Sequence, residues 1–375
     1  MNIGFDGKRA ANNLTGLGNY SRSLIRQLAE FFPQNQYFVY TPQLQEQPQI
    51  SSFFKKDHIL VKLPSKNQFR WLWRSIGIKK QLSEDQIDIY HGLSNEIPLG
   101  IQRLPLKTVV TIHDLIFLRL PQTYSITNRT IYNLKARYAC KHADRIIAIS
   151  QQTKNDIISF YGTDPAKIEV IYQSCDDTYK TLVPETDKAA VRSKYGLPDK
   201  YFLYVGTIEA RKNLLLIVQA MRSVNPDYKL VVIGRRQAYA KEVDREITAS
   251  GLTGRVLFLT GIPAADLPCI YQMASIFLYP SFYEGFGIPV IEALYSGVPV
   301  IAASGSCLEE AGGPDSIYVG PRDAAAMSAA IRSILDDPER ARMMSRRGLL
   351  YVQQFNTSSL SRQLMDCYRN MMLKN

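Results

Sequence analysis

Cysteine is scarce in this 375-residue chain, and long apolar runs are missing. The cysteines are odd in number, lie far apart and form no Cys-x-x-Cys pair; they are Cys140, Cys175, Cys269, Cys307 and Cys367. Their scarcity argues against a disulfide framework or a zinc site, and for a reducing cytoplasm. No run of roughly 18 apolar residues occurs, so we expect no membrane-spanning helix. A strand begins within the opening MNIGFDG, so we also expect no signal peptide.

Positive charge is in excess and is unevenly spread. The formal charge is +11; residues 1–184 hold 23 Lys and Arg against 15 Asp and Glu, and the remainder holds 22 against 19. A basic N-terminal half suggests an anionic partner, such as a phosphate-bearing molecule, a lipid surface or nucleic acid. No nucleic-acid-binding motif occurs, so we expect no nucleic-acid partner.

Short apolar runs alternate with helical patterns, which predicts parallel α/β sheets. In the first half these runs are Asn2–Phe5, Tyr37–Tyr40, Ile59–Lys62, Ile87–His91, Lys107–Ile112, Arg145–Ile149 and Ile168–Ile171. In the second half they are Tyr201–Val205, Lys229–Ile233, Val256–Leu259, Ile276–Tyr279, Val298–Ile301 and Ile317–Val319. The charged segment Asp176–Lys200 predicts a linker with a short helix. The length fits two domains of about 180 residues each. We therefore expect two doubly wound, Rossmann-like domains with a ligand between them, beyond the carboxyl ends of the strands.

The stretch Tyr279–Leu294, YPSFYEGFGIPVIEAL, joins a strand to a helix through a glycine loop. Gly285 and Gly287 let a ligand approach bare backbone, and the helix start that follows attracts an anion. Glu284 and Glu292 offer carboxylates, which accept hydrogen bonds from hydroxyl groups. These groups together suit a nucleotide sugar, which carries both phosphates and hydroxyls. The alternative is an ordinary tight turn with a glutamate placed favourably on the helix dipole.

Other polar groups also follow strand ends. The segment Gly206–Asn213, GTIEARKN, places Arg211 and Lys212 after a glycine turn, where two cations suit a diphosphate. The alternative is a solvated basic pair. His113 and Asp114 end another strand, in a position from which a side chain points into a ligand cleft.

The loop and the basic segment carry a family resemblance. The run from Glu284 to Ala293 resembles the Glu-Gly-Phe-Gly-x-Pro-x-x-Glu-Ala signature of the retaining, GT-B-fold glycosyltransferases of family four, also called glycosyl transferases group 1. GTIEARKN is similar to the Gly-Thr-x-x-x-Arg-Lys-Asn segment of that family, and Gly16–Tyr20 is similar to its N-terminal glycine loop. One departure is Gln173-Ser-Cys-Asp176, where the family usually has Asn-Gly-Val-Asp.

The resemblance implies a role for each candidate site residue. It implies a donor site made by Gly16, Gly18, Gly206, Thr207, Arg211, Lys212, Glu284, Gly285, Phe286, Gly287, Ile288 and Glu292. Glu284 is implied to hold the sugar and Glu292 the ribose. Catalytic roles fall to His113, Arg211, Lys212 and Glu284, which leaves His91 and Asp114 on the acceptor side. No metal is expected, because the helix dipole and the two cations make one unnecessary; Asp176-Asp177 is an acidic pair but lies in the linker.

The same resemblance gives domain bounds and an activity. An acceptor-side domain is expected at residues 1–176 plus a C-terminal crossover helix at 357–375, and a donor-binding domain at 177–356. The implied activity is retaining transfer of a hexosyl unit from a UDP- or GDP-sugar, of mannosyl, glucosyl or GlcNAc type. The acceptor is a glycan or lipid-linked glycan in polysaccharide or glycoconjugate biosynthesis. The alternatives are a nucleotide-sugar epimerase, a sucrose- or glycogen-type synthase, and a nucleotide-sugar-binding protein without turnover.

One further segment bears on location. Lys66–Lys80 holds five cations, no acid and both tryptophans of the chain. Phe69, Leu72, Trp73 and Ile76 fall at helical spacing, and the cations Lys66, Arg70 and Arg74 lie on another face. Such a helix can rest on an anionic membrane, which would make the protein cytoplasmic and peripheral at the membrane's inner face. The alternative is an amphipathic helix that covers the first sheet.

Overall fold

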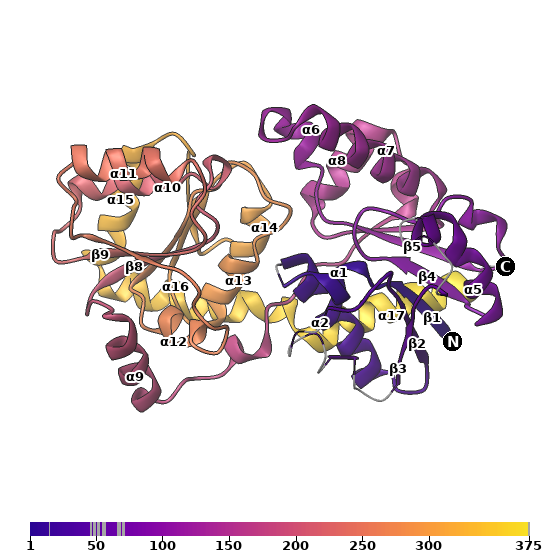
Figure 1. Ribbon diagram of the computed structural model, residues 1–375. Helices are drawn as coiled ribbons and strands as arrows, with labels where there is room; N and C mark the ends of the chain where they lie inside the picture. The colour runs from indigo at the N-terminus through magenta and orange to yellow at the C-terminus, as the bar shows by residue number, and fades with distance from the viewer. Residues whose placement is uncertain are drawn as a thin grey trace. The chain divides into compact units, whose positions relative to one another are not determined.

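The structure is a computed structural model of the chain. It describes residues 1–373 except 15, 46, 48, 49, 51, 52, 55–57, 66–68, 70 and 71. The chain forms two compact units, Met1–Gln173 with Thr357–Asn375, and Ser174–Asn356. The boundary expected after residue 176 lies three residues beyond the observed one. Each unit is built on one parallel sheet, as the strands in Figure 1 show.

The first unit has a sheet in the order β3-β2-β1-β4-β5-β6-β7. Its strands are β1 (Asn2–Asp6), β2 (Gln36–Tyr40), β3 (Ile59–Lys62), β4 (Ile89–Gly92), β5 (Lys107–Ile112), β6 (Arg145–Ala148) and β7 (Ile168–Val170). The strand order reverses between β1 and β4, which pair side by side. Ligands of doubly wound sheets bind at such a reversal, beyond the carboxyl ends of the strands. These strands overlap the runs predicted for the first half of the chain, and their bounds differ from the predicted ones by at most two residues.

Helices cover both faces of this sheet. They are α1 (Lys8–Asn12), α2 (Gly16–Phe31), α5 (Ile78–Glu84), α6 (Ile116–Arg119), α7 (Ile126–His142), α8 (Gln151–Tyr161) and α17 (Thr357–Leu373). Successive strand residues point to opposite faces. Tyr90 of β4 therefore packs in the cluster that includes α5, α7 and α8, while its neighbour His91 points toward α17. Helix α8 begins where the Ser150 side chain accepts from the Thr153 N–H and ends at Gly162, whose φ is +62°.

The terminal helix α17 belongs to the first unit although it follows the second in sequence. It packs against α2, and its Tyr368 and Met365 contact His91 and Asn35 of the first unit. The family resemblance implies such a crossover helix at residues 357–375. Among the described residues, the length and polarity of every helix rule out a membrane span.

The second unit has a sheet in the order β10-β9-β8-β11-β12-β13. Its strands are β8 (Tyr201–Val205), β9 (Lys229–Ile233), β10 (Val256–Leu259), β11 (Ile276–Tyr279), β12 (Val300–Ala303) and β13 (Ile317–Val319). Its helices are α9 (Glu185–Tyr195), α10 (Leu214–Ala220), α11 (Ala240–Ala249), α12 (Leu267–Gln272), α13 (Ile288–Tyr295), α14 (Leu308–Gly312), α15 (Ala324–Leu335) and α16 (Pro338–Tyr351). The order again reverses, between β8 and β11, and these two strands carry the principal motifs at their carboxyl ends.

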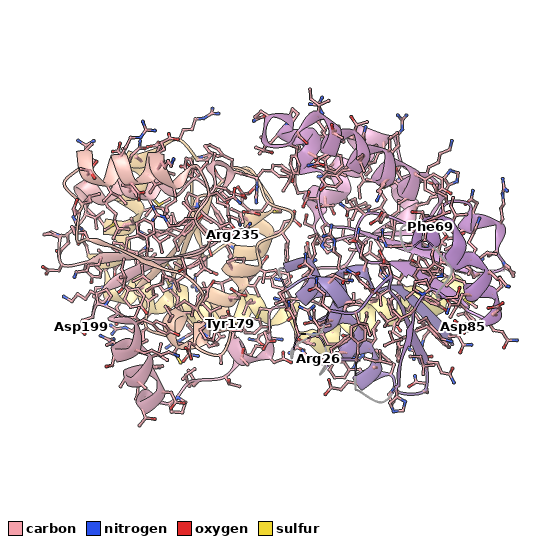
Figure 2. The ribbon with its side chains drawn as sticks, viewed as in Figure 1. Arg26, Phe69, Asp85, Tyr179, Asp199 and Arg235 are labelled. Carbon is pink, nitrogen blue, oxygen red and sulfur yellow. The ribbon has the colours of Figure 1, made fainter. Side chains whose placement is uncertain are left out.

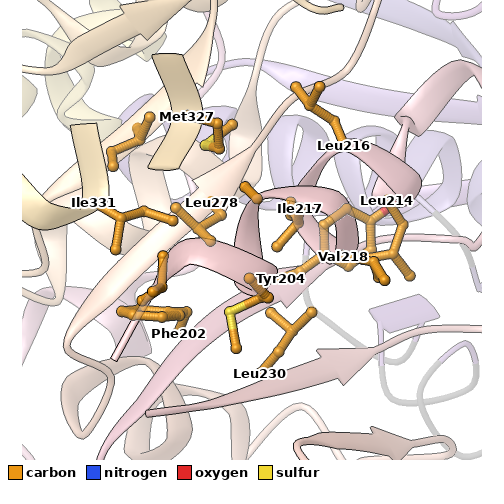
Figure 3. Close-up of a cluster of buried hydrophobic side chains, with 14 of the residues drawn as sticks. Phe202, Tyr204, Leu214, Leu216, Ile217, Val218, Leu230, Leu278, Met327 and Ile331 are labelled. Carbon is orange, nitrogen blue, oxygen red and sulfur yellow. The ribbon is translucent and has the colours of Figure 1, made fainter. Parts of the chain in front are cut away.

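The core of the second unit lies against one face of its sheet. Figure 3 shows Phe202, Tyr204, Leu230 and Leu278 of the strands packed with side chains of α10 and α15, including Ile217 and Met327. The intervening residues of the same strands, such as Leu203 and Phe277, are buried on the other face. Both faces are therefore apolar, which explains the continuous hydrophobic runs of the parallel strands.

Candidate active site

The two motif segments of the second unit meet at one edge of the sheet. Strands β8 and β11 are adjacent and parallel, so the segment after Val205 and the segment after Tyr279 leave the same edge. A backbone bond from Phe282 N–H to the Arg211 carbonyl (2.9 Å) joins the two segments. Asn213, in the left-handed region at φ +57°, donates its side-chain amide to the carbonyls of Pro280 (3.1 Å) and Pro321 (2.7 Å).

Glu284 is paired with both motif cations. One carboxylate oxygen lies 2.7 Å from Arg211 Nη1, and the other lies 2.9 Å from Lys212 Nζ. The three side chains are only 13–15% exposed. The Tyr279 hydroxyl donates to the same glutamate (3.2 Å) and accepts from Lys212 Nζ (2.6 Å). The groups predicted to hold sugar and diphosphate are therefore one connected cluster.

A second carboxylate balances the charge of the cluster. Glu209 pairs with Arg211 at 2.7 Å, and Arg211 also donates to the Tyr283 carbonyl at 2.6 Å. Burial opposes ionisation of Glu284, but the charges of Lys212 and Arg211 outweigh it and lower the pKa of Glu284 to about 2. Burial alone would lower the pKa of Arg211, yet Glu284 and Glu209 raise it. The cluster therefore brings together two acidic and two basic side chains as ion pairs.

The glycine loop is held by packing as well as by its own turn. A side chain at Gly287 would lie 2.9 Å from Ala311 and 3.1 Å from Leu308, so α14 requires glycine there. Phe286 is buried against Phe355 at a ring distance of 5.4 Å. Its side chain therefore serves the core, and only its backbone faces the loop. The Cys307 thiol donates to the carbonyls of Glu284 (3.1 Å) and Phe286 (2.8 Å).

The loop leads directly into a helix start. Helix α13 begins at Ile288, has no side-chain cap and carries proline in its first turn. The first N–H groups of a helix have no partner inside the helix, and they carry the positive end of its dipole. Gly285, Gly287 and Ile288 accordingly present backbone that is suited to an anion.

Glu292 differs from Glu284 in its electrostatic environment. It lies one turn into α13 and accepts a hydrogen bond from the Tyr271 hydroxyl at 2.8 Å. Burial raises the pKa of Glu292 to about 7, although the bond from Tyr271 lowers it, and the charge of Asp176 raises it further. Glu292 therefore titrates near neutral pH.

The glycine turn after β8 is shaped by its neighbours. A side chain at Gly206 would lie 3.0 Å from Lys212 Cδ, so glycine here lets the lysine fold back over the strand end. A Cβ added at Gly234 would lie 1.9 Å from the Gly206 carbonyl oxygen, so no residue with a side chain fits there. Thr207 follows, with its carbonyl accepting from the Tyr204 hydroxyl (3.3 Å). Gly234 is a structural necessity of this edge that motif reasoning missed, although it directly follows the predicted strand Lys229–Ile233. Asn213 ends the GTIEARKN motif, but the sequence assigned it no role of its own.

The two glycines in the loop of the first unit have different roles. Gly16 begins α2, is exposed, and has nothing within 4 Å of an added Cβ. Gly18 is buried, and an added Cβ would lie 1.7 Å from the Asn13 carbonyl oxygen. Gly16 therefore offers open backbone to a ligand, whereas the chain's own fold requires glycine at position 18.

His113 is neutral and held from both sides. Its Nε2 donates to the Leu93 carbonyl (2.9 Å), and its Nδ1 accepts from the Gln173 amide (3.1 Å). The carbonyl can only accept, so the proton lies on Nε2. Burial lowers the pKa of His113 to about 4. Tyr20 meets the imidazole ring edge-on at 4.7 Å. Gln173, at the position of the departure from the family pattern, thus supports this histidine.

The expectation that His91 contacts an acceptor is wrong. Its side chain is fully buried, with Nδ1 2.6 Å from the Tyr368 hydroxyl and Nε2 2.8 Å from Thr111 Oγ1. Burial, with a smaller contribution from His113, lowers the pKa of His91 to about 3. His91 therefore ties α17 to the first sheet. Asp114 Oδ1 accepts from the Ile116 N–H (3.1 Å) at the start of α6, which gives that carboxylate a local structural contact.

The segment Lys66–Lys80 does not present its cations on one outer face. Residues 66–68, 70 and 71, including Lys66 and Arg70, lie outside the described residues. Arg74 is directed inward and pairs with Asp6 and Glu96, and Trp73 is buried in the core. Phe69, labelled in Figure 2, is 73% exposed. The expected placement of Arg74 on a membrane-facing side is therefore wrong, because two buried carboxylates bind it.

The acidic pair after the first unit is also engaged locally. Asp176 accepts from Thr178 N–H (3.0 Å), and Asp177 pairs with Lys180 (2.5 Å). In the part of the chain that the structure describes, no group of three or more His, Cys, Asp or Glu side chains is arranged to hold a metal ion.

Two family models match the chain. Residues 187–350 match the model described as "Glycosyl transferases group 1", and residues 14–179 match "Glycosyltransferase Family 4". The O-antigen chain mannosyltransferase B of Escherichia coli is 28% identical, over 95% of this chain and 96% of that protein. The O-antigen chain mannosyltransferase RfbU of Salmonella typhimurium is 27% identical, over 61% of each chain.

Solved structures resemble the whole fold. HepE of Anabaena, crystallised with UDP and glucose, has a TM-score of 0.77 at 19% identity, over 99% of this chain and 100% of that one. At this identity the likeness concerns the fold, which is GT-B with two parallel-sheet, Rossmann-like units.

Proposed function

Because the chain belongs to glycosyltransferase family 4 and is a hexosyltransferase, we propose that it moves a hexosyl unit from a nucleoside diphosphate sugar to a glycan hydroxyl, with retention of configuration at the sugar. The observation that carries this proposal is the cluster of Arg211, Lys212 and Glu284 at the carboxyl edge of the second sheet, next to an uncapped helix start. Both halves of such a donor, charged diphosphate and hydroxyl-rich sugar, find partners there.

Arg211 and Lys212 would stabilise the leaving group. Negative charge grows on the departing nucleoside diphosphate as the sugar bond breaks, and fixed cations in a water-poor site stabilise that charge strongly. Arg211 offers a planar fork of donors and Lys212 a compact ammonium. Before the donor binds, Glu209 and Glu284 balance both cations, so neither is buried without a partner.

Glu284 would serve the sugar. It is ionised, and an ionised carboxylate only accepts hydrogen bonds, as sugar hydroxyls require. Its bonds to Arg211, Lys212 and Tyr279 fix its orientation, which keeps the site at a productive geometry. The phosphate oxygens would then lie at the N–H groups of Gly285, Gly287 and Ile288.

Glu292 would bind the ribose. Tyr271 occupies its Oε2, which leaves Oε1 for a ribose hydroxyl. On the first unit, His113 is a neutral donor through Nε2, and contact with the donor sugar requires exchange of its bond to Leu93. Among the described residues of the cluster, the carboxylates of Glu209 and Glu284 are both paired with cations, which is consistent with attack by the acceptor on the same face as the leaving group.

The finer identity of the substrates rests on the relatives. Two O-antigen mannosyltransferases at 27–28% identity favour a mannosyl donor and a bacterial surface polysaccharide as the product. The UDP bound to HepE, a protein 19% identical, is weaker support for UDP. We therefore propose a GDP- or UDP-linked hexose, with mannose favoured, and a glycan or lipid-linked glycan acceptor. The chemistry of the site calls for no metal ion.

A panel of nucleotide sugars tests this function. Incubation without acceptor should release UDP or GDP slowly from the correct donor only, and a variant with Arg211→Ala and Lys212→Ala should lose that release. An epimerase would change the sugar without releasing nucleotide. A sucrose- or glycogen-type synthase would release nucleotide only with a free sugar or a glucan as acceptor. A melting temperature raised by nucleotide, without any turnover on the full panel, would identify a binding protein instead.

A further inference from the structure

Helix α7 of the first unit is basic and has apolar side chains on its surface. Its 17 residues, Ile126–His142, hold four Lys and Arg and no acid. Leu134, in the middle of the helix, is 64% exposed, and Ile131 is exposed one turn earlier. Leu134, Arg137, Tyr138 and Lys141 recur at spacings of three and four, so they share one face of the helix.

A cavity of about 490 Å³ lies along this face. Its walls are largely apolar and include Ile97, Pro98, Leu99 and Leu134. The loop that carries Leu99 is fixed in place, because Leu99 N–H donates to the Ser75 carbonyl (2.8 Å) and Gly100 N–H donates to the Tyr138 hydroxyl (2.6 Å). Leu99 itself is 48% exposed. A volume of several hundred cubic ångströms with apolar walls is typical of small-molecule sites.

The charged floor of the cavity is balanced within the protein. Arg74 pairs with both Asp6 and Glu96, and Lys135 pairs with Glu96 at 2.6 Å. Two cations and two carboxylates thus satisfy one another. A ligand group that enters the cavity therefore meets apolar walls and no unpaired charge on its floor.

The rim of the cavity carries positive charge that no described carboxylate balances. Arg137 and Lys141 line the cavity, and within the described residues neither has a carboxylate at ion-pair distance. Burial and the charges of Lys141 and Lys167 lower the pKa of His142. Two unbalanced cations beside an apolar cavity match a molecule with an anionic head and an apolar tail.

We propose that this cavity binds the phosphate-bearing lipid anchor of the acceptor, with its chain between Leu99 and Leu134 and its phosphate at Arg137 and Lys141. This inference rests on the proposed function, because it names the acceptor as lipid-linked, but the binding it describes is measurable without turnover. It also places the lipid contact at α7 and not at Lys66–Lys80. In that segment Arg74 is paired with Asp6 and Glu96 at the same cavity.

Calorimetric titration with dodecyl phosphate, below its micelle concentration, tests the proposal. Dodecyl maltoside, with the same chain, and inorganic phosphate, without a chain, are the control ligands. We expect saturable binding of one dodecyl phosphate, with both controls at least about tenfold weaker. The variant Arg137→Gln/Lys141→Gln should weaken dodecyl phosphate binding by about tenfold or more, since each cation near an anionic headgroup contributes appreciably. Leu134→Glu should abolish it.

The matched control is Arg340→Gln/Arg346→Gln, which makes the same charge change on exposed residues of α16 in the second unit. It should bind like the wild type, and all variants should keep the wild-type response of melting temperature to UDP or GDP. Equal binding of dodecyl phosphate and dodecyl maltoside, binding that survives loss of Arg137 and Lys141, or binding only to vesicles would each overturn the proposal. If the wild type bound dodecyl phosphate as expected but turned over no nucleotide sugar, the result would contradict the proposed function and leave the lipid site intact.

Discussion

The carboxyl edges of the two sheets carry different kinds of polar side chain: the second sheet carries ion pairs, and the first carries neutral histidines. At the edge of the second sheet, Glu284 forms ion pairs with both Arg211 and Lys212. At the edge of the first, His91 and His113 are neutral, buried and hydrogen-bonded at both ring nitrogens. The cations of such an ion-paired cluster can bind phosphate oxygens in addition to their carboxylate partners. A neutral, fully bonded histidine fixes geometry and holds no charge for a ligand.

The largest effect that would separate the two edges is on turnover. Arg211→Ala or Lys212→Ala should lower the rate of nucleotide release by about 10²-fold or more, the scale for loss of one charge-stabilising group. A discontinuous assay of released UDP or GDP, with Arg340→Ala as the control, measures this. If both single variants were folded and turned over normally, Arg211 and Lys212 at the carboxyl edge of the second sheet would have no catalytic role.

The two glutamates of the second edge should respond to pH with opposite signs. The pKa of Glu292 is raised from 4.5 to about 7 on folding, so the folded state binds its proton more tightly. Its contribution to stability is therefore present at acidic pH and is lost as pH rises from about 4.5 to about 7. Relative to Glu292→Gln, the wild type should lose at most about 3 kcal/mol of unfolding free energy across that window.

Glu284 has a lowered pKa, so its contribution is lost as pH falls from about 4.5 toward about 2. Urea denaturation at several pH values between about 3 and 8 compares wild type, Glu292→Gln and Glu284→Gln, so that both windows are sampled. A stability difference between wild type and Glu292→Gln that does not change over this range would show that Glu292 is ionised like its neighbour.

At the first edge we expect a stability effect without a catalytic one. His91→Phe removes the bonds to Tyr368 and Thr111 and leaves both hydroxyls buried, which should cost about 1–3 kcal/mol. The folded variant should keep its turnover number. Chemical denaturation and steady-state kinetics on the same preparation measure the two quantities. A large loss of turnover with unchanged stability would restore His91 to the acceptor site.

The smallest effect should come from Gln173. Gln173→Ala removes the donor to His113 Nδ1, while the bond from Nε2 to Leu93 remains. Removal of one such bond should cost about 1 kcal/mol and lower turnover by less than tenfold. Gln173→Asn, with the amide that the family usually carries here, should restore part of the loss. Failure of Asn to rescue, together with full activity of the Ala variant, would show that the contact is incidental.

The strands of both sheets were predictable because buried parallel strands appear in the sequence as apolar runs, and polar motifs follow these runs. The edge at which Arg211, Lys212 and Glu284 meet followed from the same pattern, since neighbouring parallel strands end together. The pairing itself did not follow, because the two partners of Glu284 lie over seventy positions away in sequence.

What failed was inference about side-chain surroundings. His91 and His113 look alike in sequence, each at the end of a strand, yet α17 buries the first from more than 270 residues away. Arg74 lies at the spacing of an outward cation, but Asp6 and Glu96 draw it inside. Such partners are set by tertiary packing, which periodicity in one segment does not record.

Calorimetric titration of wild type and Arg211→Gln with UDP and GDP tests the central claim most directly. One nucleotide should bind the wild type well, its monophosphate should bind more weakly, and Arg211→Gln should reduce the diphosphate's affinity by about tenfold or more while leaving that of the monophosphate nearly unchanged. Equal losses for diphosphate and monophosphate, or no loss for either, would contradict the assignment of this cluster as the diphosphate site.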